Sequence, residues 1–75
     1  MNKERRQKIK NIKNHLEDIK NELSIILSEE EFAFDSMPEG LQSSMRGMNS
    51  EDAIDSMNEA IENIDNTINN LSDIM

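Results

Sequence analysis

The sequence predicts an all-α protein, an antiparallel two-helix hairpin of coiled-coil type that dimerises into a four-helix bundle. Two apolar repeats, each alternating steps of three and four residues, indicate two long helices. The only Pro and both Gly fall between the repeats and indicate a turn. The chain has 75 residues, so we expect one domain over residues 1–75.

The first helix is expected at about residues 3–36. Pro38 disfavours helical geometry at Met37 and should end the helix there. The repeat averages 3.5 residues, which places its members on one stripe that should face the second helix. These members are Ile9, Ile12, Leu16, Ile19, Leu23, Ile26, Glu30, Ala33 and Met37.

The turn is expected at residues 37–49 and the second helix at about 50–75. Within the turn, a short helical segment should start at Pro38 and stop at Gly47. Asn49 or Ser50 is expected to cap the second helix. We expect Leu41, Met45 and Met48 to fold back as a lid on this end of the hairpin. The second repeat comprises Ile54, Met57, Ile61, Ile64, Ile68, Leu71 and Met75.

Charge is distributed unevenly along the chain. Residues 1–13 carry six bases and one acid, whereas residues 14–75 carry two bases and fifteen acids. In the antiparallel arrangement the basic start should either project beyond the hairpin or lie beside its acidic C-terminal end. Asp65 and Asp73 are the nearest acids that would neutralise it. Such a surface repels phosphate and lacks Trp and Tyr for base stacking, so direct nucleic-acid binding is not expected.

Self-association is expected because a hairpin of this size buries little apolar surface. Additional apolar side chains flank the two stripes, and this width suits a bundle better than a two-stranded coil. They are Ile25, Leu27, Phe32, Phe34, Ala53, Ala60 and Ile74. No apolar stretch suits a signal peptide or a membrane span, so we expect a soluble protein of the cytoplasm.

Catalysis, metal binding and cofactor binding are not expected. His15 is the only histidine, and we interpret it as a polar residue beside the stripe rather than a pH switch. The stretches SEEEF and DNTINN lack the spacing of carboxylate-metal or calcium sites. No serine or threonine has an evident base partner, and no small-molecule substrate is indicated.

The acidic residues of the second helix have two interpretations. Asp55, Glu59, Glu62 and Asp65 lie outside the apolar stripe, and the helix offers no base nearby to pair with them. They either form a solvated face, or they present carboxylates to a basic protein surface, including one that binds nucleic acid. We select these four as candidate partner-binding residues.

A second candidate surface lies at the turn end. Phe32, Phe34, Met45 and Met48 gather there in the sequence. Met-rich apolar surfaces adapt to several partners, but the same residues can also cap the hydrophobic core. Both interpretations remain open from the sequence.

Three segments together resemble small helical-hairpin proteins carried by phages and prophages of bacteria. They are RRQKIKNIKNHLEDIKNEL, EEEFAFDSMPEGLQSSMRG and AIDSMNEAIENIDNTINNL. The resemblance implies a non-enzymatic accessory protein that binds a host protein, including defence or nucleic-acid-binding proteins, and inhibits or sequesters it in the host cytoplasm. The alternative is a structural or assembly component whose helices complete a larger bundle. We expect the hairpin to form a homodimer, or to complete its core with another protein.

Overall fold

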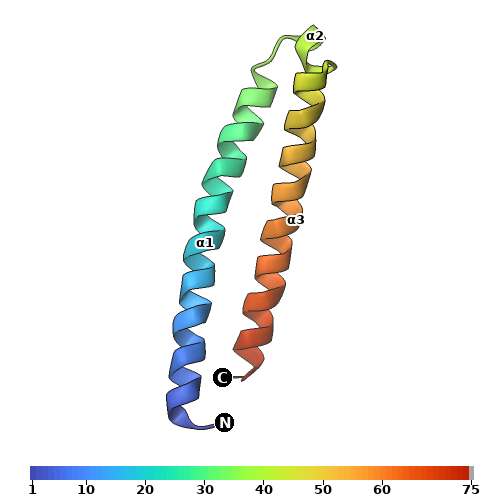
Figure 1. Ribbon diagram of the computed structural model, residues 1–75. Helices are drawn as coiled ribbons and strands as arrows, with labels where there is room; N and C mark the ends of the chain where they lie inside the picture. The colour runs from blue at the N-terminus through green and yellow to red at the C-terminus, as the bar shows by residue number, and fades with distance from the viewer. Residues whose placement is uncertain (75) are drawn as a thin grey trace.

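The computed structural model describes residues 1–74 and consists of three helices. These are α1 (Lys3–Asp35), α2 (Glu39–Gln42) and α3 (Met45–Ile74). Helices α1 and α3 lie side by side and run in opposite directions, so the start of α1 and the end of α3 lie at the same end of the molecule (Figure 1). The all-α prediction is confirmed. The second helix was expected to reach Met75, which lies outside the described residues.

The molecule is a rod, with extents of 58 × 15 × 12 Å. Its radius of gyration is 17.1 Å, whereas a globular domain of this length would have about 11 Å. The first turns of α1 extend beyond the end of α3 (Figure 1). A rod of this kind has little interior, and among residues 1–74 the only buried apolar side chains are Leu27 and Ile68.

Helix α1 begins and ends with satisfied backbone groups. The Asn2 side chain caps the start by accepting a hydrogen bond of 2.8 Å from the backbone N–H of Arg5. At the other end, the Phe34 carbonyl accepts bonds from Met37 N, at 3.0 Å, and from Gln42 Nε2, at 3.1 Å. Pro38 then starts α2, and its carbonyl accepts from Leu41 N at 2.9 Å.

Helix α3 begins at Met45 rather than at about residue 50. Ser44 is the residue that caps it: the Ser44 hydroxyl accepts from Gly47 N at 3.4 Å, and the Ser44 carbonyl accepts from Met48 N at 2.9 Å. The prediction of a cap at Asn49 or Ser50 was therefore wrong, since both residues lie inside the helix.

Gly47 does not end α2 as expected but lies buried in the first turn of α3. A Cβ atom at Gly47 would overlap the backbone carbonyls of Gln42 and Leu41. Only glycine lets the end of α2 approach α3 this closely, which explains why the chain reverses in so few residues.

The face that α1 turns toward α3 differs from the predicted stripe by one residue at every second position. Ile9, Leu16, Leu23 and Glu30 are half-buried as predicted. However, Ile12, Ile19 and Ile26 are 52%, 49% and 53% exposed, and Ala33 is also exposed. Their expected places are taken by residues one position later along the chain, namely Lys13, Lys20, Leu27 and Phe34.

The physical reason for this shift is that the apolar surface of α1 is wider than one partner helix can cover. Helix α3 covers the side that includes Leu27 and Phe34 and leaves the isoleucines uncovered. On α3 itself the predicted stripe does face α1: Ile68 is buried, and Ile54, Met57, Ile61, Ile64 and Leu71 are half-buried.

Candidate protein-binding surfaces

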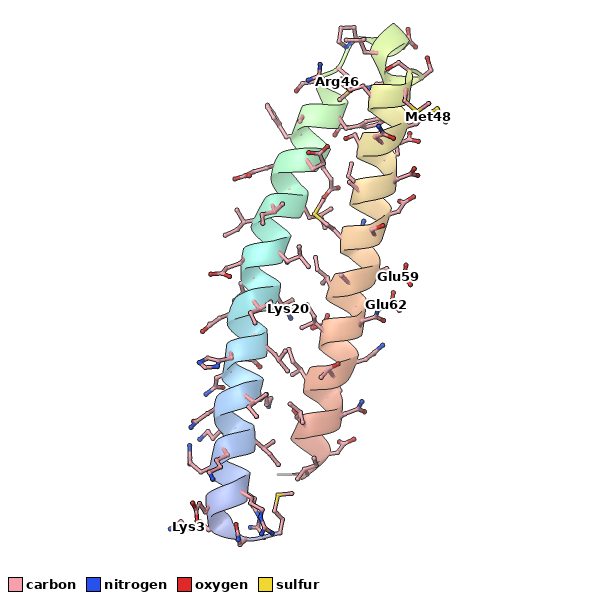
Figure 2. All side chains as sticks on the ribbon, viewed as in Figure 1. Lys3, Lys20, Arg46, Met48, Glu59 and Glu62 are labelled. Atoms are coloured by element: carbon pink, nitrogen blue, oxygen red, sulfur yellow. The ribbon has the colours of Figure 1, made fainter. Side chains whose placement is uncertain are left out.

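A row of four carboxylates follows the outward side of α3. We call Asp52, Asp55, Glu59 and Glu62 the acidic row. Their spacing of three, four and three residues places them on one helix face, and all four side chains are exposed. Glu59 and Glu62 point away from α1 (Figure 2). Within residues 1–74, no Lys or Arg forms a salt bridge with any of the four.

Asp65, the fourth predicted acid, has a different environment. Its Oδ1 atom lies 2.8 Å from Nζ of Lys20, which reaches across from α1 into the space between the helices (Figure 2). The hydrogen bond to Asp65, reinforced by the carboxylate's charge, raises the pKa of Lys20 above 10.5. Asp65 is thus already paired within the chain and is set apart from the acidic row.

This salt bridge also corrects the expectation that Asp65 neutralises the basic first turns. Among the described residues, the only acid that forms a salt bridge with the segment 3–13 is Glu4, which lies 3.6 Å from Lys8 in the same helix. Asp73 forms no salt bridge with it. Most of the positive charge at the start of α1 is therefore left without an intramolecular partner in residues 1–74.

At the turn end, the structure brings together two of the four predicted apolar residues. Phe34 and Met48 line one surface hollow, together with Glu39, Gly40, Gln42, Ser43 and Glu51. Phe34 also lines an adjoining hollow, together with Glu31, Asp35, Glu51, Ile54 and Asp55. The second hollow joins the aromatic ring to Asp55, so the turn-end surface and the acidic row are continuous.

Phe32 and Met45 line neither hollow. Their exposed fractions are 74% and 72%. Leu41 and Met48 are also exposed, at 44% and 52%, so the expected lid of Leu41, Met45 and Met48 does not form. Of the four predicted apolar residues, Phe34 is the one that is half-buried.

Sequence reasoning missed the hydrogen bond that Ser50 forms across the helix pair. Ser50 is buried, and its hydroxyl lies 2.6 Å from Oε1 of Glu30. Glu30 was recognised as the charged residue in an otherwise apolar repeat. The signal for its partner was present too, because Ser50 precedes Ile54 by four residues and so extends the second stripe.

The sequence also gave no sign that Ile12, Ile19 and Ile26 would form a surface. We call these three residues the isoleucine stripe. They recur every seven residues, so they lie in line along α1. Because they were assigned to the buried contact with α3, their exposure identifies a second apolar face of the helix pair.

The only histidine and the clusters of acids are the candidate metal ligands of this chain. His15 is exposed on α1. Within residues 1–74, no three His, Asp or Glu side chains converge in a way that would hold a metal ion. In the same range, no helix has an apolar stretch sufficient to cross a bilayer.

Comparison with known proteins identifies no relative: the chain matches no family model, no curated protein and no solved structure.

Proposed function

We propose that this protein is a non-enzymatic interaction module that binds a basic surface of another protein through the acidic row. The observation that carries the proposal is the row itself, four exposed carboxylates on one rigid helix with no salt-bridge partner in the described chain. By its resemblance to small phage and prophage hairpins, the partner is a host protein, which is inhibited or sequestered in the host cytoplasm.

The acidic row lowers the stability of the free protein, and this cost supports a role for the row in binding. Asp52 and Asp55, Asp55 and Glu59, and Glu59 and Glu62 are like-charge neighbours at helical spacing. Each such pair destabilises a helix by about 0.2–0.5 kcal/mol. A basic partner would relieve this repulsion. The relief of repulsion would contribute to the free energy of binding.

The linear arrangement suits a basic groove that otherwise holds a nucleic-acid strand. The row repeats twice in seven residues, so one carboxylate occurs about every 5 Å along the helix axis. One strand of duplex DNA carries a phosphate about every 3.4 Å. The row therefore has the sign and straightness of a phosphate backbone at a lower charge density, which favours a narrow contact with a few Lys or Arg side chains.

Apolar contact at the turn end would add to this binding. Phe34 lies beside Asp55 in the same hollow, and Met48 lines the hollow next to it. Aromatic side chains that become buried in a partner's pocket are common anchors of protein interfaces. We assign the primary contact to Asp55, Glu59 and Glu62, with Phe34 and Met48 as anchors and Phe32 and Met45 at the periphery.

We further propose that the helix pair is a self-contained hairpin unit that dimerises into a four-helix bundle. The chain exposes 5645 Å², whereas a folded monomer of 8.6 kDa typically exposes about 4,700 Å². The excess of about 900–1,000 Å² is close to what one partner buries in a standard interface, about 800 Å². The uncovered isoleucine stripe also favours the second candidate function, a structural component that completes a larger bundle.

The test of the binding function is capture of a bacterial lysate protein at increasing NaCl concentration. We expect the captured protein to be basic, and to elute as salt screens the contact. Glu59→Lys combined with Glu62→Lys should abolish capture. The matched control is Glu17→Lys with Asp18→Lys, which makes the same charge change at exposed positions on α1 and should leave capture intact.

Two results would contradict the proposal. Equal loss of capture in the control variant would mean that net charge alone is responsible. Capture that resists salt and disappears on Phe34→Ala would place the binding energy at the apolar turn end and would favour the structural function.

A further inference from the structure

The helix pair has two different sides, which the Lys20–Asp65 salt bridge allows us to assign. Lys20 belongs to the edge of α1 formed by Lys13, Lys20 and Leu27, and the isoleucine stripe lies on the opposite edge of the same helix. On α3, Asp65 marks the same side as Lys20. Ala53, Ala60, Thr67 and Ile74 recur every seven residues on the edge opposite Asp65. One side of the pair therefore carries the salt bridge, and the other carries apolar and small side chains, among which Thr67 is polar.

This apolar side has the width of two helices. The isoleucine stripe supplies large side chains from α1, and Ala53 and Ala60 supply small ones from α3, so a second helix pair could approach α3 closely. The acidic row lies on neither of these edges but on the outward face of α3. A partner on the apolar side would thus leave the acidic row free.

We propose that a second copy of this chain covers the apolar side, with the two α1 helices antiparallel and Ile19 of one copy against Ile19 of the other. The inference rests on the proposed dimer and adds its face, direction and register. Ile12 of each copy then contacts Ile26 of the other. Ala60 of one α3 lies near Thr67 of the other, and the four helices close into a square bundle.

Charge complementarity selects the antiparallel direction. In this register, residues 3–13 of one copy lie along residues 25–35 of the other. The first segment has a net charge of +5, and the second carries four acids and no base, a net charge of −4. Parallel α1 helices would instead place each segment against its own copy and would repel.

The polar residues beside the isoleucine stripe also favour antiparallel α1 helices. Lys8, His15, Glu22 and Glu29 recur every seven residues along its outer margin, and all four are exposed. The antiparallel register pairs Lys8 with Glu29 of the second copy, and His15 with Glu22. The Lys8–Glu29 pair would neutralise part of the basic segment, for which residues 1–74 of a single chain provide only Glu4.

The amount of surface also fits. Each copy has about 900–1,000 Å² more exposed surface than a folded monomer of its mass, and a standard interface covers about 800 Å² per partner. A second copy on one side of the rod would bring the exposed surface to the usual value without covering the acidic row.

Cysteine cross-linking tests face, direction and register together, because the chain has no native Cys. The variants are Ile12→Cys, Ile19→Cys and Ile26→Cys, with Asn21→Cys on the opposite side of α1 as the matched control. Under mild oxidation we expect Ile19→Cys to form a covalent dimer by itself. Ile12→Cys and Ile26→Cys should cross-link only when mixed with one another, and Asn21→Cys should remain monomeric under denaturing conditions.

Light scattering of the unmodified chain separates this inference from the proposed dimer. If the chain is a dimer and Ile12→Cys cross-links to itself, the antiparallel register is wrong. If the chain is a dimer and only Asn21→Cys cross-links, the proposed face is wrong. In both cases the proposed dimer itself would stand. A monomer at 100 μM would overturn both, and would leave the apolar side to another protein.

A substitution provides a second measurement. Ile19→Asp should weaken the dimer by roughly 100-fold, since a carboxylate from each copy would be buried at the centre of the interface. Ile19 is half exposed within one chain, so the helical circular dichroism of the dissociated variant should remain. Unchanged dimerisation in Ile19→Asp would contradict the proposal.

Discussion

The Ser50 hydroxyl donates a hydrogen bond of 2.6 Å to the Glu30 carboxylate and joins the two long helices near the turn. Glu30 occupies a position that an apolar residue would fill in an uninterrupted coiled-coil stripe. Its carboxylate is half-buried, while Ser50 is buried. The bond therefore satisfies a polar group at a place where the neighbouring interhelical residues, Leu27 and Ile54, are apolar.

We predict that Ser50→Ala lowers the free energy of unfolding by about 1 kcal/mol, because Glu30 would lose its partner in a partly dry site. Glu30→Gln keeps an acceptor oxygen and should cost less. Combining Ser50→Ala with Glu30→Leu removes both polar groups and should restore the stability of the original chain or exceed it. Urea denaturation followed by circular dichroism measures all three. A neutral Ser50→Ala would show that the hydrogen bond contributes nothing.

The two glycines provide a matched pair of substitutions. Gly47→Ala should destabilise the protein by about 1–3 kcal/mol, since the new methyl group would force α2 away from α3. Gly40→Ala meets no atom within 4 Å and should stabilise by about 0.5–1 kcal/mol, because alanine loses less backbone entropy in a helix. Thermal unfolding of the two variants should give shifts of opposite sign. Shifts in the same direction would contradict the close approach at Gly47.

The salt bridge between Lys20 and Asp65 should make stability depend on pH in the alkaline range. The pKa of Lys20 is raised in the folded protein, so its contribution is fully present below pH 10.5 and is lost as pH rises through the raised value. Lys20→Gln should therefore destabilise at pH 8, and the difference from the original chain should shrink as pH rises through the raised pKa of Lys20.

Lys13→Gln is the control for this measurement. Lys13 lies seven residues before Lys20 on the same edge of α1, and no salt bridge joins it to an acid within residues 1–74. The two variants change net charge equally. If both have the same pH profile, overall charge rather than the specific pair is responsible.

Neutralising the acidic row should stabilise the free protein while weakening binding. Glu59→Gln removes the charge repulsion of Glu59 with Asp55 and with Glu62, and should raise the free energy of unfolding by about 0.5 kcal/mol. The same variant should elute from its captured partner at lower salt. Opposite changes in stability and binding are expected of a functional surface, whereas a merely solvated face would change stability alone.

The long helices could be predicted because their apolar repeats extend over many residues, so single exceptions such as Glu30 do not alter the pattern. The rotation of α1 about its axis could not. Ile26 and Leu27 are equally apolar and adjacent, and which of them is buried depends on how α3 lies. The Lys20–Asp65 and Ser50–Glu30 contacts likewise depend on how α1 is rotated against α3.

The start of α3 was missed for a local reason. Several residues near the turn can act as a helix cap, including Ser44, Asn49 and Ser50, and the sequence does not rank them. The structure selects Ser44 because Gly47 allows α2 to fold against the first turn of α3. Three members of the acidic row, Asp55, Glu59 and Glu62, were selected from composition and periodicity. Asp52 was not among the selected residues, and the pairing of Asp65 was missed because its partner lies 45 residues earlier.

The order of contacts along the rod has a consequence for how the molecule opens. The bonds Gln42–Phe34, Ser50–Glu30 and Lys20–Asp65 join residues 8, 20 and 45 positions apart. Forming the bond between the residues closest in sequence costs the least chain entropy. Each bond that forms shortens the loop that must close for the next one. The two long helices should therefore separate first at the end far from the turn. Amide exchange should be fastest near residues 3 and 74 and slowest in the parts of α1 and α3 that adjoin the turn.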